Sequence, residues 1–476
     1  MRRTKIVATI GPASSSPETL REMIDAGMNV ARIGLAHGDL DAHLTTYRTI
    51  REVAAAAGQN IGILADLPGP KIRCSPFGDV PASLVNGSTV IVSGPGGQSS
   101  ATHIGIDHEG IIDHLVVGDT VAIGDGGITL VVTGTAGDAA ETEVVHGGVV
   151  QGRPGIHVPS DRIKLSTPTD EDFRLADAFI EAGVDMLAIS FVRSGHDVRR
   201  LGAEPAPRGP LVIAKIETRA AIDQLDSIMS ASDAIMVARG DLGVECSLAE
   251  LPHLQKQIIR SCVAYGRPVI TATQMLESMV SAPVPTRAES SDVANAVFDG
   301  SSAVMLSGET AIGVNPVNAV ATMADIAFRA DQEFDSENWL RRVGELRQDL
   351  GRADKTLVTT DAITMAAARI AHQVEAKAIL CMSRTGFTAR AISRFRQHTP
   401  ILCFSPEDRT VRQLSLSWGV EPLGVPNHEK PSEMIDDALR MAAQRPELSS
   451  GDTVVVVAGQ TTRTRATDSL RVVEIP

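Results

Sequence analysis

The sequence predicts an α/β protein built on a (β/α)₈ barrel, with an inserted all-β lid domain and a C-terminal α/β domain. The chain has 476 residues, which is enough for two to four domains of ordinary size. Short β-rich runs alternate with amphipathic helical patterns over most of residues 5–334, which is typical of repeated βα units on a parallel sheet. Between residues 73 and 155 this alternation stops, and short alternating strands between Gly-rich turns indicate an inserted β domain.

Eight segments of the predicted barrel have the composition of buried strands. In chain order they cover residues 5–10, 29–35, 60–66, 186–192, 210–217, 234–240, 268–274 and 303–308. Helical patterns follow the strands, and in the first of them Ser16 precedes Pro17, an N-cap followed by proline at the first helical position. Eight βα units predict a closed TIM barrel, whose active site lies at the carboxyl ends of the strands.

The interruptions of this pattern predict the domain bounds. The barrel takes residues 1–73 and 156–335, and the β-barrel lid domain takes residues 74–155. Because the insertion follows the third strand at the active-site end, we expect it to cover the site. A charged helical linker over 336–355 leads to a regulatory α/β domain over 352–476. Its helices are predicted at 359–374, 388–396, 410–418 and 431–444, and its strands at 378–382, 400–404, 452–458 and 470–475.

Composition excludes several classes of protein. The formal net charge of −14 argues against non-specific nucleic-acid binding, because phosphates attract a basic surface. No apolar segment is long enough to span a bilayer, and the N-terminus lacks the pattern of a signal peptide, so we expect a cytoplasmic protein without a membrane partner. The five cysteines form no C-x-x-C pair and are expected to be reduced packing residues.

Polar residues gather at the predicted strand ends, where a purely structural strand would not need them. They are Arg32, Arg73, Lys215, Glu217, Asp241 and Thr273, with Arg239 and Gly240 directly before Asp241. A phosphoryl group is bound well by a guanidinium, a lysine and a divalent cation held by carboxylates. The strand ends offer all three, so they predict a site for an anionic phosphorylated substrate.

Four stretches resemble the signature motifs of pyruvate kinases. They are MVARGDLGVE at 236–245, ATQMLESM at 272–279, PTRAE at 285–289 and MLSGET at 305–310. The similarity extends from Thr4 to near the C-terminus and includes the order barrel, lid, barrel, α/β domain. The resemblance therefore implies transfer of the phosphoryl group of phosphoenolpyruvate to ADP, giving pyruvate and ATP in glycolysis.

The resemblance also implies a role for individual residues. Glu217 and Asp241 would hold Mg²⁺ or Mn²⁺. The catalytic residues would be Lys215, Thr273, Arg32 and Ser307, and phosphoenolpyruvate would be bound by Arg32, Arg73, Lys215, Gly240, Asp241 and Thr273. The nucleotide would be bound by Thr9, Pro12, His37, Arg73 and Arg153. For His37 a packed surface histidine is the alternative interpretation.

The sequence departs from the family pattern at the monovalent-cation site. Potassium-requiring members hold K⁺ with an asparagine and a serine after strand two and an aspartate and a threonine after strand three. This chain has Gly34 and Ala36, then Asp66 and Leu67, so three of the four ligands are absent. Lys71 stands where those members have glutamate, and its ammonium, with Asp66, is expected to replace the ion, so that K⁺ is not required.

Other departures affect the nucleotide half of the site. Pro154 occupies the position of a lysine that reaches the nucleotide phosphates, so either Arg153 substitutes for it or the affinity for ADP has fallen. Gly124 and Asp125 stand where the lid usually has paired acidic residues. Two alternatives therefore stay open: a phosphoenolpyruvate-using paralogue with a changed acceptor, and a non-catalytic regulatory paralogue.

A loop of the C-terminal domain predicts regulation. Ser383, Thr385, Gly386 and Thr388 lie between a strand and a helix, where free N–H groups favour a phosphate. The loop resembles the effector-phosphate loop of regulated pyruvate kinases, and Arg463 and Arg465 could add positive charge. The alternative is an ordinary helix N-cap. The resemblance also implies a homotetramer and a phosphorylated effector.

Overall fold

The computed structural model describes residues 2–124, 126–158, 165–348, 355–428, 430–459 and 467–476. Eight parallel strands close into a barrel in the order β1, β16, β15, β14, β13, β12, β3, β2. Their bounds are β1 Lys5–Ile10, β2 Val30–Gly34, β3 Gly62–Asp66, β12 Met186–Ile189, β13 Leu211–Ile216, β14 Ala234–Ala238, β15 Val269–Ala272 and β16 Ala303–Leu306. The predicted (β/α)₈ barrel is confirmed.

Several strands end earlier than the sequence pattern predicts. β14 stops at Ala238 because a helix begins at Arg239, and β15 stops at Ala272. Thr273 and Gln274 have φ values of 66° and 52°, which lie in the left-handed region and cannot continue a strand. Functional side chains therefore leave the barrel from turns just beyond the strand ends.

Two layers of apolar side chains hold the barrel. Alternate strand residues such as Val7, Met186 and Met236 fill the barrel interior, and their neighbours, such as Ile6 and Ile235, face the surrounding helices. The helices of the barrel are α1 Pro17–Asp25, α2 Leu40–Ala56, α3 Asp170–Glu181, α4 Gly195–Arg200, α5 Arg219–Asp223, α6 Leu225–Ala231, α7 Arg239–Glu245, α8 Leu251–Tyr265, α9 Arg287–Asp299, α10 Gly308–Ala311 and α11 Pro316–Gln332, with a 3₁₀ turn η2 Glu277–Val280.

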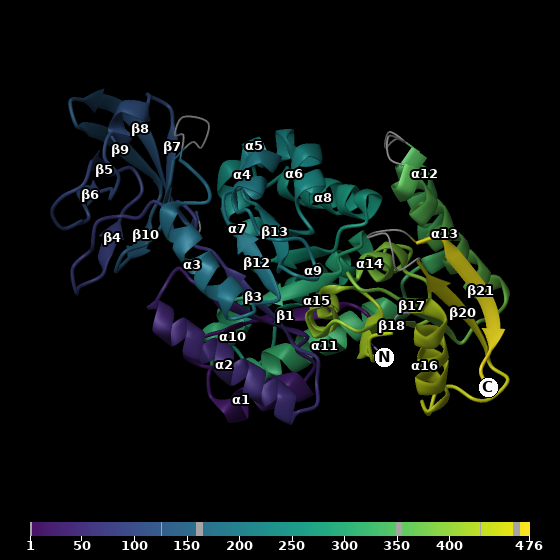
Figure 1. Ribbon diagram of the computed structural model, residues 1–476. Coiled ribbons are helices and arrows are strands. Elements are labelled where there is room, and N and C mark those ends of the chain that lie inside the picture. The colour runs from purple at the N-terminus through teal and green to yellow at the C-terminus, as the bar shows by residue number, and fades with distance from the viewer. Residues whose placement is uncertain (1, 125, 159–164, 349–354, 429, 460–466) are drawn as a thin grey trace.

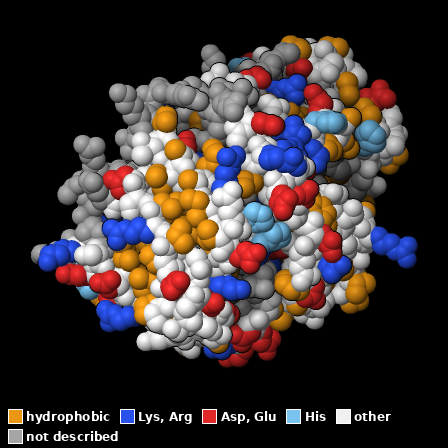
Figure 2. Space-filling model, turned by 90° about the vertical axis from the view of Figure 1, so that its right-hand side faces the viewer, with side chains coloured by type: hydrophobic (Ala, Val, Ile, Leu, Met, Phe, Trp, Pro, Cys, Tyr) orange, Lys and Arg blue, Asp and Glu red, His pale blue; other side chains and the backbone are white. Residues whose placement is uncertain are grey.

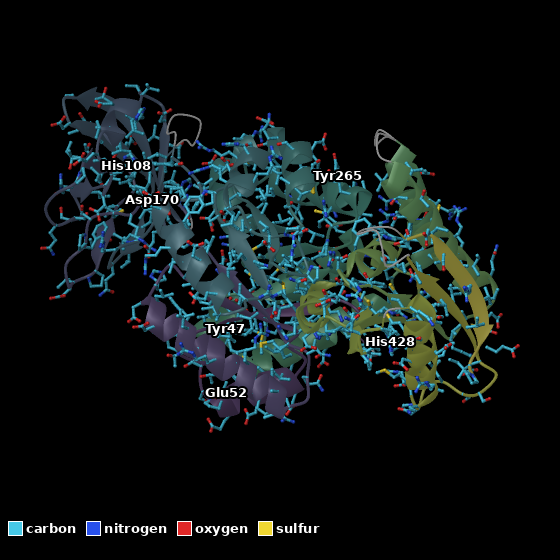
Figure 3. All side chains as sticks on the ribbon, viewed as in Figure 1. Tyr47, Glu52, His108, Asp170, Tyr265 and His428 are labelled. Carbon is cyan, nitrogen blue, oxygen red and sulfur yellow. The ribbon has the colours of Figure 1, made fainter. Side chains whose placement is uncertain are left out.

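Helices α2 and α3 show how this outer layer is fastened. The Tyr47 ring meets Phe179 edge-on with centroids 6.1 Å apart, and the Tyr47 hydroxyl donates to the carbonyl oxygen of Ala182 at 2.8 Å. Figure 3 shows Tyr47 on α2 inside the molecule, whereas Glu52 of the same helix lies at its outer edge. The amphipathic spacing of α2 thus places one face against the barrel.

The inserted domain projects from one side of the barrel (Figure 1). Its elements are β4 Ala82–Leu84, β5 Thr89–Ser93, β6 His103–Gly105, η1 Ile111–His114, β7 Thr120–Ile123, β8 Ile128–Ala136, β9 Ala139–His146, β10 Gly148–Val150 and β11 Ile156–His157. Six strands form one sheet in the order β11, β7, β8, β9, β5, β6, and β10 pairs with β4. Ile156 and Val158 belong to the core of this domain, so it extends slightly beyond the predicted bound at residue 155.

The C-terminal domain is a five-stranded sheet with helices on its faces. Its helices are α12 Ser336–Gln348, α13 Lys355–Gln373, α14 Phe387–Ser393, α15 Asp408–Gln413 and α16 Pro431–Ala443, with η3 Leu414–Leu416. Its strands, in sheet order, are β19 Val420–Gly424, β18 Ile401–Ser405, β17 Ala378–Met382, β20 Thr453–Ala458 and β21 Ser469–Glu474. The sequence pattern missed β19, whose Pro422 is typical of an edge strand.

The segment predicted as a linker packs against the barrel. Trp339 and Val343 of α12 are buried, and the Trp339 indole N–H donates to the carbonyl of Arg394 at 2.8 Å. Arg396 is 2% exposed and lies over the rings of Phe334, Trp339 and Trp418. Apolar packing and cation–π contacts therefore join the C-terminal domain to the barrel.

Two further predictions concern the chain as a whole. All five cysteines are free and buried, as expected of packing residues. Within the described ranges, no helix combines the length and apolar character needed to cross a membrane.

Candidate active site

Lys215 stands near the end of β13 among acidic and hydroxyl groups. Its Nζ lies 2.8 Å from Glu217 Oε1 and 3.4 Å from Asp66 Oδ1, and it donates to Ser190 Oγ at 2.7 Å. Burial acts to lower the pKa of Lys215, but the charges of Asp66 and Glu217 outweigh it and raise the pKa above the ordinary value. Lys215 therefore remains a cation at every physiological pH.

Arg32 and Asp66 form a second charged pair beside Lys215. Arg32 Nε donates to Asp66 Oδ2 at 2.7 Å, and Arg32 Nη1 donates to Thr9 Oγ1 at 2.9 Å. Burial acts to raise the pKa of Asp66, but Lys215 and Arg32 lower it overall, so the carboxylate stays ionised. The structure thus brings together Arg32, Asp66 and Lys215, which the sequence placed on three different strands.

Glu217 and Asp241 are the two predicted metal ligands. Glu217 is 1% exposed, its Oε2 accepts from the Phe191 N–H at 2.7 Å, and its Oε1 is paired with Lys215 Nζ at 2.8 Å. Burial, and then the charge of Asp241, raise the pKa of Glu217. Carboxylate oxygens are the ligands that a divalent cation prefers, so the chemistry of Glu217 and Asp241 fits such an ion.

Asp241 lies between two basic side chains. Lys71 Nζ and His157 Nε2 are each 3.6 Å from Asp241 Oδ1. Burial acts to raise the pKa of Asp241, but Lys71, Lys215 and His157 lower it overall. Within the part of the chain that the structure describes, no group of three or more His, Cys, Asp or Glu side chains converges.

Thr273 is held in a strained turn beside α7. A φ of 66° at a β-branched residue costs about 1–3 kcal/mol and persists only where neighbouring contacts impose it. Thr273 Oγ1 donates to the carbonyl of Ala272 at 2.6 Å and accepts from the Gly240 N–H at 2.8 Å. The N–H of Gly240, a residue expected to bind phosphoenolpyruvate, is thus bonded to Thr273, because the turn brings that hydroxyl over the start of α7.

Ser307 and Thr9 line the neighbouring strand ends. Ser307 Oγ is buried and has no hydrogen-bond partner, while the Ser307 N–H donates to Glu309 Oε2 at 2.6 Å. Thr9 Oγ1 donates to the carbonyl of Leu306 at 2.9 Å, so it is fixed between β1 and β16. Pro12 lies exposed in the loop between β1 and α1.

The predicted nucleotide residues are only partly brought together. Although the His37 side chain is exposed, partial desolvation and the nearby charges of Arg73 and Lys71 lower its pKa, which favours the neutral ring. Arg73 Nη1 donates to the carbonyl oxygen of Arg153 at 3.3 Å. The guanidinium of Arg153 pairs instead with Asp107 of the lid.

At the predicted monovalent-cation site, Lys71 pairs with Asp241, whereas its predicted partner Asp66 is paired with Arg32 and Lys215.

The predicted effector loop is tightly bonded. Thr388 is 6% exposed and shares a hydrogen bond with the hydroxyl of Thr467 at 2.7 Å, and Ser383 is buried. Thr385 is half-buried and its Oγ1 accepts from the Phe387 N–H at 3.4 Å, while Gly386 has a φ of 72°. Arg463, Arg465 and the lid residue Asp125 lie outside the described residues.

Three site residues were missed in the sequence. Ser190 directly follows β12, so the rule that polar residues at strand ends are functional would have found it. Phe191 has a φ of 56° and His157 belongs to a lid strand, and neither property can be read from residue type. Their contacts with Glu217 and Asp241 depend on how separate segments meet.

Comparisons with known proteins agree along the whole chain. The family model "Pyruvate kinase, barrel domain" matches residues 1–320, and "Pyruvate kinase, alpha/beta domain" matches residues 361–473. A pyruvate kinase of Bacillus licheniformis is 40% identical over 99% of this chain and 80% of its own length. A pyruvate kinase 2 of Synechocystis is 40% identical over 96% of this chain and 76% of its own length. A pyruvate kinase of Clostridium acetobutylicum is 36% identical over the full length of both chains. Because both domain models match and these relatives cover nearly the whole chain, the chain belongs to the pyruvate kinase family.

Proposed function

We propose that this protein transfers the phosphoryl group of phosphoenolpyruvate to ADP, giving pyruvate and ATP in glycolysis, without a requirement for K⁺. The observation that carries the proposal is the ammonium of Lys215, held between Asp66 and Glu217 beside Arg32. Full-length relatives named pyruvate kinase support the same reaction.

In this proposal the chain supplies fixed charges for phosphoryl transfer. Lys215 keeps its proton, so it acts as a permanent cation toward charge that develops on the transferring group and the enolate. Arg32 and Arg73 offer guanidinium groups to the phosphate. Glu217 and Asp241 would hold Mg²⁺ or Mn²⁺, and the bound cation would neutralise phosphate and carboxylate oxygens of the substrate.

The second half of the reaction is protonation of enolpyruvate at carbon. Thr273 is proposed to relay a proton through water, because a threonine hydroxyl alone is a poor acid. Ser307 Oγ, buried and without a hydrogen-bond partner, is a second hydroxyl on the same rim. The hydroxyl of Thr273 is already oriented by Gly240 and Ala272, which favours directed transfer.

The proposal that K⁺ is unnecessary rests on Lys71. Gly34, Ala36 and Leu67 offer no side-chain oxygen, whereas Lys71 places an ammonium 3.6 Å from Asp241 Oδ1. A lysine charge at this point takes the place of a monovalent cation next to the proposed metal carboxylate.

Steady-state turnover with and without K⁺ tests this proposal. With Mg²⁺ or Mn²⁺ present, pyruvate formation should be nearly the same in K⁺ and in a tetramethylammonium salt of equal ionic strength, and it should stop when EDTA removes the divalent cation. In Lys71→Met, which removes the charge but keeps most of the volume, turnover should fall. Strong activation of the wild type by K⁺ would contradict the proposal.

One observation favours a changed phosphoryl acceptor as the second candidate. The Arg153 guanidinium, proposed for the nucleotide, pairs with Asp107 in the lid, and Pro154 adds no charge. Comparing ADP, GDP, UDP and water as acceptors separates the two candidates, since ADP should be used efficiently only in the first. Robust pyruvate formation with any acceptor excludes a non-catalytic regulatory paralogue.

The proposal assigns the domains different tasks. Residues 1–73 and 156–335 carry the chemistry, residues 74–155 close over it, and residues 352–476 regulate it. The β11 strand supports the lid role, because His157 extends from the lid to Asp241. A phosphorylated effector at Ser383, Thr385, Gly386 and Thr388, and a homotetramer, complete the proposal.

A further inference from the structure

The guanidinium of Arg239 contacts the backbone of the turn that follows β15. Its Nη2 donates to the carbonyl of Thr273 at 2.7 Å and to that of Gln274 at 3.2 Å. Its Nε lies 3.3 Å from the carbonyl oxygens of both Ala272 and Thr273. Three successive carbonyls therefore converge on one planar group.

This convergence requires the unusual backbone of the turn. In an extended strand, successive carbonyls point to opposite sides, so one guanidinium could not bond to three of them in a row. The left-handed conformations of Thr273 and Gln274, with φ values of 66° and 52°, turn the carbonyls to the same side. Arg239 thus stabilises a backbone that a threonine would not adopt by itself.

The other side of the guanidinium is anchored to the barrel helices. Arg239 Nη1 donates to Asp292 Oδ2 of α9 at 2.6 Å and lies 3.4 Å from Gln255 Oε1 of α8. The Arg239 side chain is 10% exposed, whereas that of Asp292 is 36% exposed. A rigid fork with five donors can hold both sides at once, which a lysine ammonium cannot do with the same geometry.

We infer that Arg239 is a positioning residue for proton transfer, acting through the hydroxyl of Thr273. The inference rests on the proposed function and deepens it. Arg239 holds the Thr273 backbone, and the next residue, Gly240, donates its N–H to Thr273 Oγ1. Among the hydrogen bonds and ion pairs of the described residues, none joins Arg239 to Lys215 or Arg32, the charges proposed for phosphoryl transfer.

The two halves of the reaction should therefore respond differently when the hydrogen bonds from Arg239 to the Thr273 turn are lost. In the proton-transfer half, a proton from solvent passes by way of water and the Thr273 hydroxyl to C3 of enolpyruvate. The electron pair of the carbon–carbon double bond forms the new C–H bond, and the C2 oxygen becomes the carbonyl of pyruvate. A displaced hydroxyl impairs this step, while the charges around the phosphoryl group stay in place.

The test uses the full chain with Mg²⁺ and two separate measurements. Exchange of the C3 hydrogens of pyruvate with D₂O, followed by NMR, reports proton transfer, and rapid-quench formation of ATP from phosphoenolpyruvate and ADP reports phosphoryl transfer. In Arg239→Lys we expect exchange to fall at least tenfold more than ATP formation. In Asp292→Asn, which leaves Arg239 in place but weakens its anchor, we expect a smaller change in the same direction.

The matched control is a second Arg–Asp pair, at the opposite end of the barrel. Arg51 pairs with Asp185 and donates to the carbonyl of Ile61, both of which precede strands. Arg51→Lys should lower the unfolding temperature without separating the two rates. Equal losses of exchange and ATP formation in Arg239→Lys would overturn the inference.

Two further outcomes are decided in advance. If Arg239→Lys fails to fold, Asp292→Asn decides, and equal losses of the two rates there overturn the inference. A wild type that shows neither exchange nor ATP formation refutes the proposed function itself, and the inference falls with it. If the wild type shows both exchange and ATP formation, but the two rates fall equally in the variants, only the positioning role of Arg239 is refuted.

Discussion

Lys215 shows how a buried charge is kept available at the residue scale. Its side chain is 12% exposed, yet Asp66 and Glu217 hold its pKa above the ordinary value. Paired carboxylates offset the loss of hydration that would otherwise favour the neutral amine. The result is a preorganised cation that needs no rearrangement when a charged substrate binds.

Replacing Lys215 should abolish phosphoryl transfer without unfolding the protein. In Lys215→Met we expect ATP formation to fall by at least about 10²–10³-fold, because one preorganised charge aimed at a transition state contributes about 3–4 kcal/mol. Rapid-quench kinetics measure the rate, and circular dichroism checks the fold. Lys5→Met is the control, since Lys5 begins β1 at the other end of the barrel and donates to the carbonyl of Val420. Near-normal turnover by a folded Lys215→Met protein would refute the assignment.

Asp66 should make stability depend on pH in the acid range. Although burial acts against it, Lys215 and Arg32 lower the pKa of Asp66 in the folded state below 3.8. The folded state therefore binds fewer protons than the unfolded state. The stabilisation from ionised Asp66 is fully present above about pH 5, and it is lost as the pH falls through the folded pKa. Urea unfolding of the metal-free protein should show a steeper loss of stability below about pH 4 in the wild type than in Asp66→Asn. Parallel pH profiles would contradict this assignment.

At the scale of single elements, α9 begins with a capping box. Thr286 Oγ1 accepts from the Glu289 N–H at 3.2 Å, and Glu289 Oε2 accepts from the Thr286 N–H at 2.7 Å. Glu289 also accepts from the N–H of Ser278 at 2.7 Å, so the cap ties α9 to the 3₁₀ turn η2. This matters for the site because α9 carries Asp292, the anchor of Arg239.

Removing the cap should destabilise the barrel measurably. Thr286→Ala is expected to lower the free energy of unfolding by about 1 kcal/mol, because an orphan N–H of the first turn loses its acceptor. Thr286→Ser, which keeps the hydroxyl, should stay close to the wild type. Chemical denaturation with unchanged slope provides the measurement. If both variants unfold at the same denaturant concentration as the wild type, the cap contributes nothing to the free energy of unfolding.

At the scale of the whole molecule, the C-terminal domain presents surface that an assembly could use. Val374 and Val472 are exposed at 39% and 47%. Figure 2 shows hydrophobic side chains gathered on the side of the molecule that faces right in Figure 1, among interspersed acidic and basic groups. Such a face fits the proposed homotetramer, in which an effector could bias two arrangements of the subunits.

A sugar phosphate or nucleoside monophosphate should lower the apparent KM for phosphoenolpyruvate. Thr385→Glu should remove this response and keep basal activity, because an added carboxylate repels the phosphate at the loop. Ser450→Glu, an exposed position of the same domain, is the charge-matched control. Fructose 1,6-bisphosphate, glucose 6-phosphate, ribose 5-phosphate and AMP are the ligands to screen, with light scattering to follow the assembly. Hyperbolic kinetics unaffected by all four, or a stable monomer, would count against regulation of this kind.

The eight barrel strands and the existence of the lid could be predicted because both depend on local pattern. Alternating β and helical periodicity predicted eight barrel strands, and the loss of that periodicity after the third strand predicted the insertion. Strand ends were less accurate, since Thr273 has a good strand composition but is turned into a left-handed conformation by contacts from Arg239 and Gly240. Edge strand β19 was missed because its Pro422 weakens the local signal.

By itself, the sequence determined the fold class, the family and the residue types at the strand ends, because these depend on periodicity and motif. The tertiary structure alone decided which charges meet: Lys71 with Asp241, and Arg153 with Asp107. It also showed that the Gly240 N–H is bonded to Thr273 and that Arg239 holds the carbonyls of that turn. Such pairings depend on the path of the backbone between segments far apart in the chain, and charge and hydrogen-bonding capacity alone allow many partners.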